Sequence, residues 1–463
     1  MADDTPPDVR SLVLYQVFPR NHGATGRLAD VTADIPRIAA LGVDVLYLMP
    51  VHPIGQEGRK GSAGSPYAIR DYRSVNPELG SEADFDELVS AAHAAGLRVM
   101  LDVVFNHTSP DSVLVGEHPE FFHRDASGRP VTSVPAWTDI IDLRHPDPRL
   151  ARYLIDSLAG WVRRGVDGFR CDVASLVPVG FWVQARTELA AVRPGLLWLA
   201  ETVHPSMVEQ RRAAGIATAC DGEMFAAFDI EYSYDLWSIW QEVVQGRQPV
   251  GRYLEMLRWQ EATLPAAGSK LRYVENHDNY RIMAFAPSAA QARAWTALMA
   301  ASPGPLMVYA GQESGARTWP QLFERDPVAW GDRELTGFIA ALAALKKHPA
   351  QRSGSFRVLA DEPVVQLAWG TQLEGVVAPV ADGPALLAVC NVGSASEPVA
   401  VPLADGRYRD LISGDPVTVV AGRLAAPEAA VVLESGAPMP VAGWRTPLLD
   451  VFLHVEVLGD ERP

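Results

Sequence analysis

The sequence contains little cysteine. Its three cysteines, Cys171, Cys220 and Cys390, lie far apart along 463 residues. A disulfide framework needs paired cysteines and a zinc site needs closely spaced ligands, so this pattern argues against both. The simplest interpretation is a reducing compartment, and we expect a cytoplasmic protein.

Signals for export or membrane insertion are also lacking. The first ten residues, MADDTPPDVR, have neither the basic region nor the apolar run of a secretory signal. The uncharged stretch 294–310 is long enough to suggest a membrane span. The sequence Pro303-Gly304-Pro305 divides it, however, which predicts a buried helix, a turn and a strand instead.

Positive charge is scarce. The chain has 40 Lys and Arg against 56 Asp and Glu, a formal net charge of -16. Nucleic acids and anionic membrane surfaces attract basic proteins, so we expect neither as a partner. The oligomeric state is not indicated by any feature of the sequence.

Short apolar runs, by contrast, are frequent, and helical patterns separate them. One such helical segment is 81–96, with Ser81 as a candidate N-cap. Runs that are apolar on both faces are typical of parallel strands covered by helices. The pattern favours an α/β fold, a (β/α)8 barrel over residues 1–348, rather than an open doubly wound sheet. The eight runs are 11–19, 43–50, 97–107, 166–174, 196–202, 222–230, 271–278 and 305–313.

Two segments depart from this alternation. Residues 108–147 show no helical pattern, so we predict a small insertion after the third strand. After residue 348 strand-like runs and turn signals replace the helices, which predicts a C-terminal antiparallel β-sandwich domain over 349–436. Residues 437–463 form either a tail or a final strand.

The run GVDGFRCDVA, residues 165–174, carries charges inside an apolar strand. Arg170 and Asp172 lie two positions apart, so they share one face of the strand. They form either a structural ion pair or a carboxylate that a cation keeps ionised for nucleophilic attack. In the second case we expect Arg170 to lower the pKa of Asp172.

Polar residues also follow other predicted strands. Asp102 and His107 end the third, Glu201 ends the fifth, and His277 and Asp278 end the seventh. Because the carboxyl ends of barrel strands meet at one mouth, we expect carboxylates from three strands to face one pocket there.

Four segments in this order, DVVFNH, GVDGFRCDVA, WLAET and VENHD, closely resemble the signature segments of the α-amylase family, glycoside hydrolase family 13. GSPYAIRDY (64–72) and GPLMVYAGQE (304–313) are similar to that family's loop after strand two and its last barrel strand. The resemblance covers the barrel and the β domain.

The resemblance implies a role for each matching residue. Asp172 would be the nucleophile, Glu201 the general acid/base and Asp278 a stabiliser of the transition state. The implied substrate-binding residues are Tyr67, which would stack on a sugar ring, and Asp102, His107, Arg170 and His277. In addition, Glu201 follows the apolar run LLWLA, which we expect to desolvate it so that it holds a proton.

The family also bears on cofactors. No motif implies an organic cofactor, and we expect none to be required. Residues similar in position to Asn106 and Asp142 help to bind calcium in many relatives, so calcium is possible here. The flat faces of aromatic rings also stack on sugar rings. Four tryptophans are either such sugar-binding platforms or core residues, namely Trp137, Trp237, Trp240 and Trp259.

Three functions follow from the resemblance. The first is a retaining hydrolase that acts on α-1,4-glucans or maltooligosaccharides, and the second is a transglycosylase with the same residues. Arg59-Lys60 in a glycine-rich loop is similar to a loop of maltosyltransferases with a phosphorylated donor, or is simply a solvated basic loop. The third is a non-catalytic glycan-binding relative, against which the presence of all three carboxylates argues.

Overall fold

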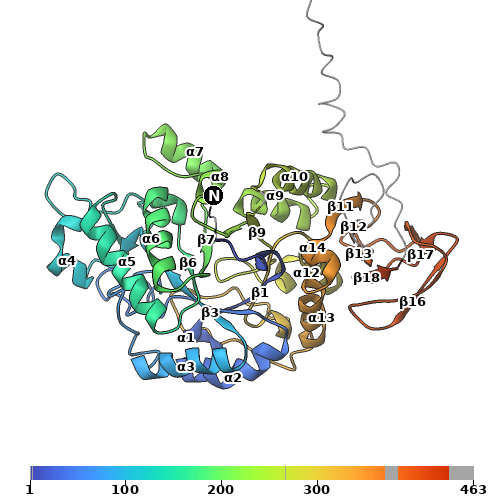
Figure 1. The fold of residues 1–463 in the computed structure, drawn as a ribbon, viewed down its shortest axis with the longest axis horizontal. Helices are drawn as coiled ribbons and strands as arrows, with labels where there is room; N and C mark the ends of the chain where they lie inside the picture. The colour runs from blue at the N-terminus through green and yellow to red at the C-terminus, as the bar shows by residue number, and fades with distance from the viewer. Residues whose placement is uncertain (1, 3, 266, 371–383, 437–463) are drawn as a thin grey trace, which may run out of the picture.

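Eight short parallel strands form a nearly closed barrel in the computed structural model, which describes residues 2, 4–265, 267–370 and 384–436 (Figure 1). The strands neighbour one another in the order β10-β1-β2-β3-β6-β7-β8-β9. A parallel bridge between Arg272 and Leu306 joins the last strand to the first and completes the ring. The predicted (β/α)8 barrel is confirmed. Its strands are β1 (Val13–Val17), β2 (Val45–Leu48), β3 (Arg98–Val103), β6 (Gly168–Cys171), β7 (Leu197–Ala200), β8 (Ile230–Tyr232), β9 (Ser269–Leu271) and β10 (Leu306–Tyr309).

Two of the predicted strands are misplaced. The run 222–230 begins in a short helix, α8 (Asp221–Met224), and only its last residue belongs to β8. Met224 and Phe228 are buried in the core that the barrel strands share with their helices, so these apolar residues pack without being extended. Most of 271–278 lies beyond β9, in a loop at the mouth of the barrel.

Helices cover the outside of the barrel, as Figure 1 shows. Ser81 caps one of them, since its hydroxyl accepts a hydrogen bond from the Asp84 N–H at 3.2 Å. The stretch 294–310 forms helix, turn and strand as expected. The main helices are α2 (Leu28–Ala40), α3 (Glu82–Ala94), α5 (Pro148–Arg163), α6 (Val179–Val192), α9 (Tyr234–Val244), α10 (Val250–Thr263), α12 (Ala289–Ala301) and α13 (Thr336–Lys346).

An insertion follows β3, as predicted. It contains the two-stranded pair β4 (His107–Thr108) and β5 (Ile141–Asp142) and the short helix α4 (Val113–Glu117). In the pairing of β4 with β5, His107 lies opposite Asp142. The insertion therefore starts and ends at the carboxyl edge of the barrel, where it forms one wall of the cleft described below.

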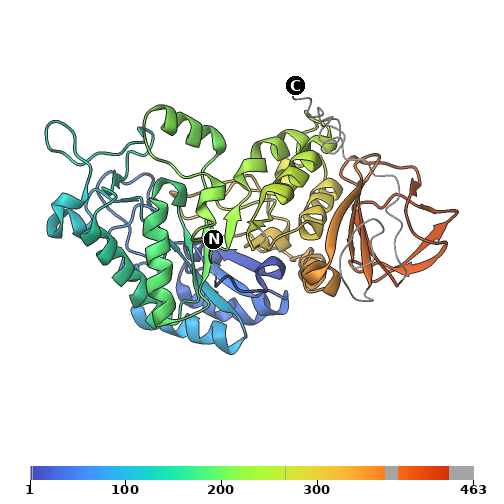
Figure 2. The same ribbon diagram turned by 45° about the horizontal axis from the view of Figure 1, so that its top comes forward.

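Two four-stranded antiparallel sheets form the C-terminal part and pack face to face, which confirms the predicted sandwich (Figure 2). Leu387 of one sheet and Val419 of the other share a single apolar core. The part docks on α12, where the Trp369 indole N–H donates to the Ala301 carbonyl at 2.6 Å. The sheets are β11 (Ser355–Ala360), β12 (Val365–Gly370), β13 (Ala385–Cys390) and β18 (Ala430–Ser435), and β14 (Val399–Ala400), β17 (Arg423–Leu424), β16 (Pro416–Val420) and β15 (Gly406–Arg409).

The domain boundaries given above stay predictions, and residues 437–463 lie outside the described residues. Within the described ranges, every helix is too short or too polar to cross a membrane.

Candidate active site

A cleft of about 360 Å³ opens at the carboxyl ends of the barrel strands. Asp172 directly follows β6, Glu201 directly follows β7, and Asp278 lies in the loop after β9. The structure brings five of the eight predicted site residues to the cleft wall, namely Tyr67, His107, Asp172, Glu201 and Asp278. The other three, Asp102, Arg170 and His277, are buried beside it.

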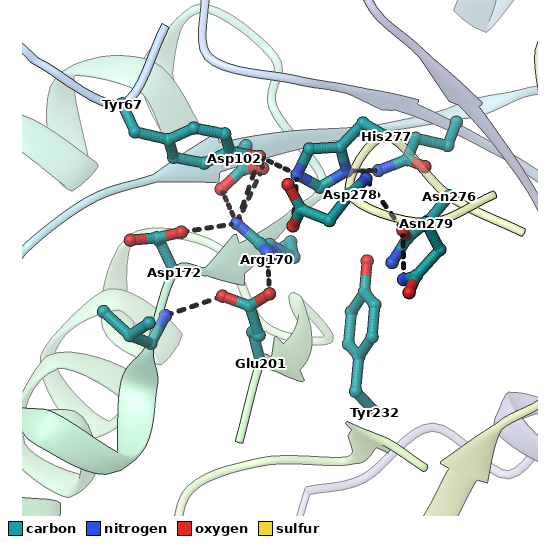
Figure 3. A network of polar contacts seen from close by, with 12 residues as sticks. Tyr67, Asp102, Arg170, Asp172, Glu201, Tyr232, Asn276, His277, Asp278 and Asn279 are labelled. Carbon is teal, nitrogen blue, oxygen red and sulfur yellow. Dashed lines mark hydrogen bonds and ion pairs between the residues drawn. The ribbon is translucent and has the colours of Figure 1, made fainter. Parts of the chain in front are cut away.

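Arg170 is the cation at the centre of this site (Figure 3). Its Nη1 lies 2.8 Å from Asp102 Oδ1 and 3.1 Å from Asp172 Oδ1, and its Nη2 lies 2.7 Å from Glu201 Oε1. The guanidinium is fully buried. One positive charge therefore holds three carboxylates from three neighbouring strands, which fixes their positions relative to one another.

The predicted lowering of the Asp172 pKa is wrong in sign. Burial, and next the charge of Glu201, raise the pKa of Asp172 well above its ordinary value, and Arg170 lowers it by less than they raise it. Burial is the largest effect, and the nearby carboxylates Glu201 and Asp102 add to it, so the attraction of Arg170 does not compensate for them.

Glu201 is held by polar groups as well as by its apolar strand. It accepts hydrogen bonds from the Val173 N–H at 3.0 Å and the Tyr234 hydroxyl at 3.3 Å. Val173 has a φ of 35°, a left-handed conformation that is rare for a β-branched residue. This strained turn directs the backbone N–H of Val173 at the Glu201 carboxylate. Glu201 is therefore not in the wholly apolar environment that the sequence predicted.

Tyr67 connects the cleft to the buried residues. Its hydroxyl donates to Asp102 Oδ2 at 3.0 Å and lies 2.7 Å from His277 Nε2. The two rings are stacked, with centroids 5.5 Å apart. Burial raises the pKa of Asp102 to about 6, although Arg170 opposes this. Burial also lowers the pKa of His277 to about 3, so its imidazole is neutral at pH 7.

Gln16 of β1 was not predicted as a site residue. Its side-chain amide lies 3.0 Å from His277 Nδ1 and is fully buried. Since the amide donates there, the proton of the neutral ring lies on Nε2, which faces Tyr67. A single polar residue inside the apolar run LVLYQVF is the signal that could have identified it.

The calcium candidates fit a cation only in part. Asp142 Oδ1 is buried and has no hydrogen-bond partner in the structure, as an ion ligand would. The Asn106 amide, however, contacts His107 Nδ1 at 3.1 Å. Across the described ranges, no three His, Cys, Asp or Glu side chains form a cluster suited to a metal. Calcium therefore stays a prediction.

The four tryptophans have different environments. Trp137 lines the cleft, with its ring centroid 5.6 Å from that of His107. Trp237 and Trp240 are buried and stack on each other at 4.4 Å. Trp259 is exposed on α10, away from the cleft lining. Only Trp137 is therefore placed as a sugar platform within the cleft itself.

Family models match most of the chain. The model described as alpha amylase, catalytic domain matches residues 14–123 and 136–353, and that described as bacterial alpha amylase C-terminal domain matches residues 376–433. Among solved structures, an alpha-amylase from Lactobacillus plantarum is 40% identical, with a TM-score of 0.87, over 93% of this chain and 100% of that one. A noncanonic maltogenic alpha-amylase from Thermotoga neapolitana is 28% identical, with a TM-score of 0.79, over 92% and 99%.

Curated relatives include both hydrolases and transferases. Alpha-amylase MalA of Haloarcula japonica is 28% identical over 433 residues, 89% of this chain and 60% of that protein. An alpha-1,4-glucan:maltose-1-phosphate maltosyltransferase of Arcanobacterium haemolyticum is 32% identical over 283 residues, 53% of this chain and 38% of that protein. The chain thus spans 60% or less of the length of these two curated relatives. The matched barrel, with its strand-end carboxylates, shows that the chain belongs to the α-amylase family, glycoside hydrolase family 13.

Proposed function

We propose that this family member is a retaining α-glycoside hydrolase that acts on α-1,4-glucans or maltooligosaccharides. The observation that carries the proposal is the single cleft lined by Asp172, Glu201 and Asp278. Retaining hydrolysis needs one carboxylate to attack the sugar and one carboxyl group to deliver a proton. Because all three carboxylates are present together, a purely glycan-binding role is disfavoured.

In the first step, Asp172 attacks the anomeric carbon and its carboxylate oxygen forms a bond there. The bond from that carbon to the glycosidic oxygen breaks, and Glu201 gives its proton to this oxygen, so the leaving sugar departs as an alcohol. This step requires Asp172 to be ionised and Glu201 to carry a proton. Arg170 contacts both groups and stabilises the negative charge that remains on Asp172.

In the second step, Glu201 takes a proton from a water molecule. The hydroxide oxygen bonds to the anomeric carbon, the bond to Asp172 breaks, and the anomeric configuration of the substrate is restored. Asp278 has a half-exposed side chain in the cleft, so it is available to hydrogen-bond sugar hydroxyls in both steps.

The charges of the cleft favour a neutral sugar over a phosphorylated one. Lys60 is the one Lys or Arg in the lining of the described cleft. Its ammonium lies 2.9 Å from Asp139 and donates to the Ala136 carbonyl at 3.0 Å. Asp139 already neutralises this cation, so a phosphate would have to compete with a carboxylate for it. This supports the hydrolase more than a maltose-1-phosphate transferase.

Transglycosylation is the second candidate function, because two maltosyltransferase relatives are each 32% identical to this chain over 53% and 50% of its length. The chemistry differs only in the acceptor of the second step, where a sugar hydroxyl replaces water. Val203 and Met207, which follow Glu201 in the chain, line the cleft with apolar side chains. Such side chains favour a sugar over water as the acceptor.

Incubation of the purified protein with maltotetraose, with Asp172→Asn as a control, tests the proposal. Shorter products that the variant does not form are the expected result. Products longer than the substrate would identify the transferase instead. If neither sample changes the substrate, the maltooligosaccharide assignment is wrong.

We also propose calcium as a structural ligand between the barrel and the insertion, supported by the unpaired Asp142 Oδ1. Removal of calcium with a chelator should then lower the melting temperature, and added calcium should restore it. An unchanged melting temperature would exclude this role.

A further inference from the structure

Two exposed aromatic rings contact each other at the mouth of the barrel. Tyr280 is 49% exposed and Trp319 is 40% exposed, and their ring centroids lie 3.9 Å apart at 90°. Tyr280 follows Asp278 by two residues, and Trp319 belongs to the long loop after β10. Both loops leave the carboxyl ends of their strands, so the pair lies at the same end of the barrel as the cleft.

Stacked aromatic rings support this pair from below. Tyr280 stacks on Phe285 with centroids 5.6 Å apart, and Phe285 stacks on Trp240 at 5.9 Å. Trp240 in turn stacks on the buried Trp237 at 4.4 Å. The exposed ring of Tyr280 thus rests on a rigid column and loses little conformational freedom when a ligand covers it.

The loop between Asp278 and the pair is fixed as well. The Trp237 indole N–H donates to Asn279 Oδ1 at 3.0 Å, and the Asn279 amide donates to Asn276 Oδ1 at 2.6 Å. The same Asn276 oxygen accepts from the Asp278 N–H at 2.9 Å. One hydrogen-bonded turn therefore connects the cleft carboxylate Asp278 to Tyr280, two residues further along the chain.

The chemistry of the pair suits one ligand best. Two exposed aromatic rings in contact offer an apolar surface on which the face of a ligand ring can pack. The apolar face of a glucose ring stacks on such a surface, and a glucan chain bound in the cleft extends beyond its walls. A protein partner would need a much larger apolar area than two rings provide.

We propose that Tyr280 and Trp319, the outer platform, form a subsite that binds a glucose ring of an α-glucan away from the point of cleavage. This inference rests on the proposed action on α-glucans. The outer platform makes the protein prefer long chains to short ones, because a short chain that fills the cleft does not reach it.

Steady-state kinetics with maltotriose and maltoheptaose test the outer platform. In Trp319→Ala and Tyr280→Ala, kcat/KM for maltoheptaose should fall about 2- to 10-fold, while kcat/KM for maltotriose stays unchanged. Tyr280→Phe keeps the ring and should retain the activity on the long chain. Trp259→Ala is the matched control, since Trp259 is 48% exposed on α10 and should leave both values unchanged.

Equal values for Trp319→Ala and the unsubstituted protein on both substrates would overturn the proposal, and so would an equal loss on both. Electrophoresis in a gel that contains glycogen tests the platform independently of turnover. The unsubstituted protein should be retarded and Trp319→Ala should migrate faster. If Trp319→Ala migrates faster than the retarded unsubstituted protein but neither substrate is cleaved, the proposed hydrolysis fails and the platform holds. If the two proteins migrate alike, the platform fails.

Discussion

Arg170→Met is the substitution that most directly perturbs the charge balance of the site. Arg170 is fully buried between Asp102, Asp172 and Glu201, at 2.7–3.1 Å from their oxygens. At an effective dielectric constant of about 20, each contact contributes roughly 6 kcal/mol of Coulomb attraction. Most of this is offset by the cost of burying the charges, and loss of one partner of a buried pair typically costs about 3–5 kcal/mol.

We therefore expect Arg170→Met to lower the free energy of unfolding by about 3–5 kcal/mol at pH 7.5. The loss should shrink toward pH 5, because carboxyl groups without their cation take up protons and become neutral. Asp172 and Asp102, whose pKa values burial raises even beside Arg170, should be among these groups. The value of kcat/KM should fall at least about 100-fold, since Asp172 loses both its position and its charge.

Urea unfolding at both pH values measures the stability change. Arg186→Met is the matched control, because Arg186 is also buried and pairs with the buried Asp229 at 2.8 Å, but does not line the cleft. The control should lose stability while kcat/KM stays unchanged. A loss below about 1 kcal/mol for Arg170→Met, or an equal loss at both pH values, would refute this description of the charge network.

Three further predictions concern single residues. Burial lowers the pKa of His52 to about 4, so the folded protein keeps this residue neutral, and about 3 kcal/mol of stability is lost as pH falls from about 6.5 to 4. His52→Gln should therefore flatten the dependence of the urea unfolding midpoint on pH. An unchanged slope would contradict this. Gln16→Leu leaves the buried His277 Nδ1 without its partner, so it should lower the free energy of unfolding by about 1–3 kcal/mol and kcat/KM about tenfold. A loss of stability with unaltered kinetics would show that Gln16 does not position the ring. Val173→Gly should change the free energy of unfolding by less than about 1 kcal/mol, because relief of the left-handed strain offsets the lost side chain. It should still lower kcat/KM, because the backbone N–H of residue 173 holds Glu201. A loss of stability above about 3 kcal/mol would show that Val173 is not strained.

The sequence predicted the barrel well where strands are buried on both faces. The runs around β1, β2, β3, β6, β7 and β10 are mostly apolar on both faces, which is typical of buried parallel strands. The run 222–230 failed because burial of Met224 and Phe228 arises from a helix and a turn, and a short apolar run does not distinguish these from a strand.

The sequence identified most residues of the site, but fewer of the contacts between them and of their effects on pKa. The carboxylates were found because each ends a strand, and strand ends meet in a barrel. The raised pKa of Asp172 was missed, since it depends on burial and on the charges of the carboxylates that the fold brings next to it. Tyr280 and Trp319 lie far apart in the sequence, and only the fold of two loops brings their rings together.

The most direct test of the account is to trap the covalent intermediate on Asp172. Glu201→Gln removes both the proton donor of the first step and the base of the second step. With maltosyl fluoride as substrate the leaving group is fluoride, which needs no proton, so the first step can still proceed. The variant should accumulate a glycosyl-enzyme, and mass spectrometry of its peptides should locate one sugar adduct on Asp172. An adduct on another residue, or reaction of maltosyl fluoride without any adduct and with inversion of the anomeric centre, would contradict the account.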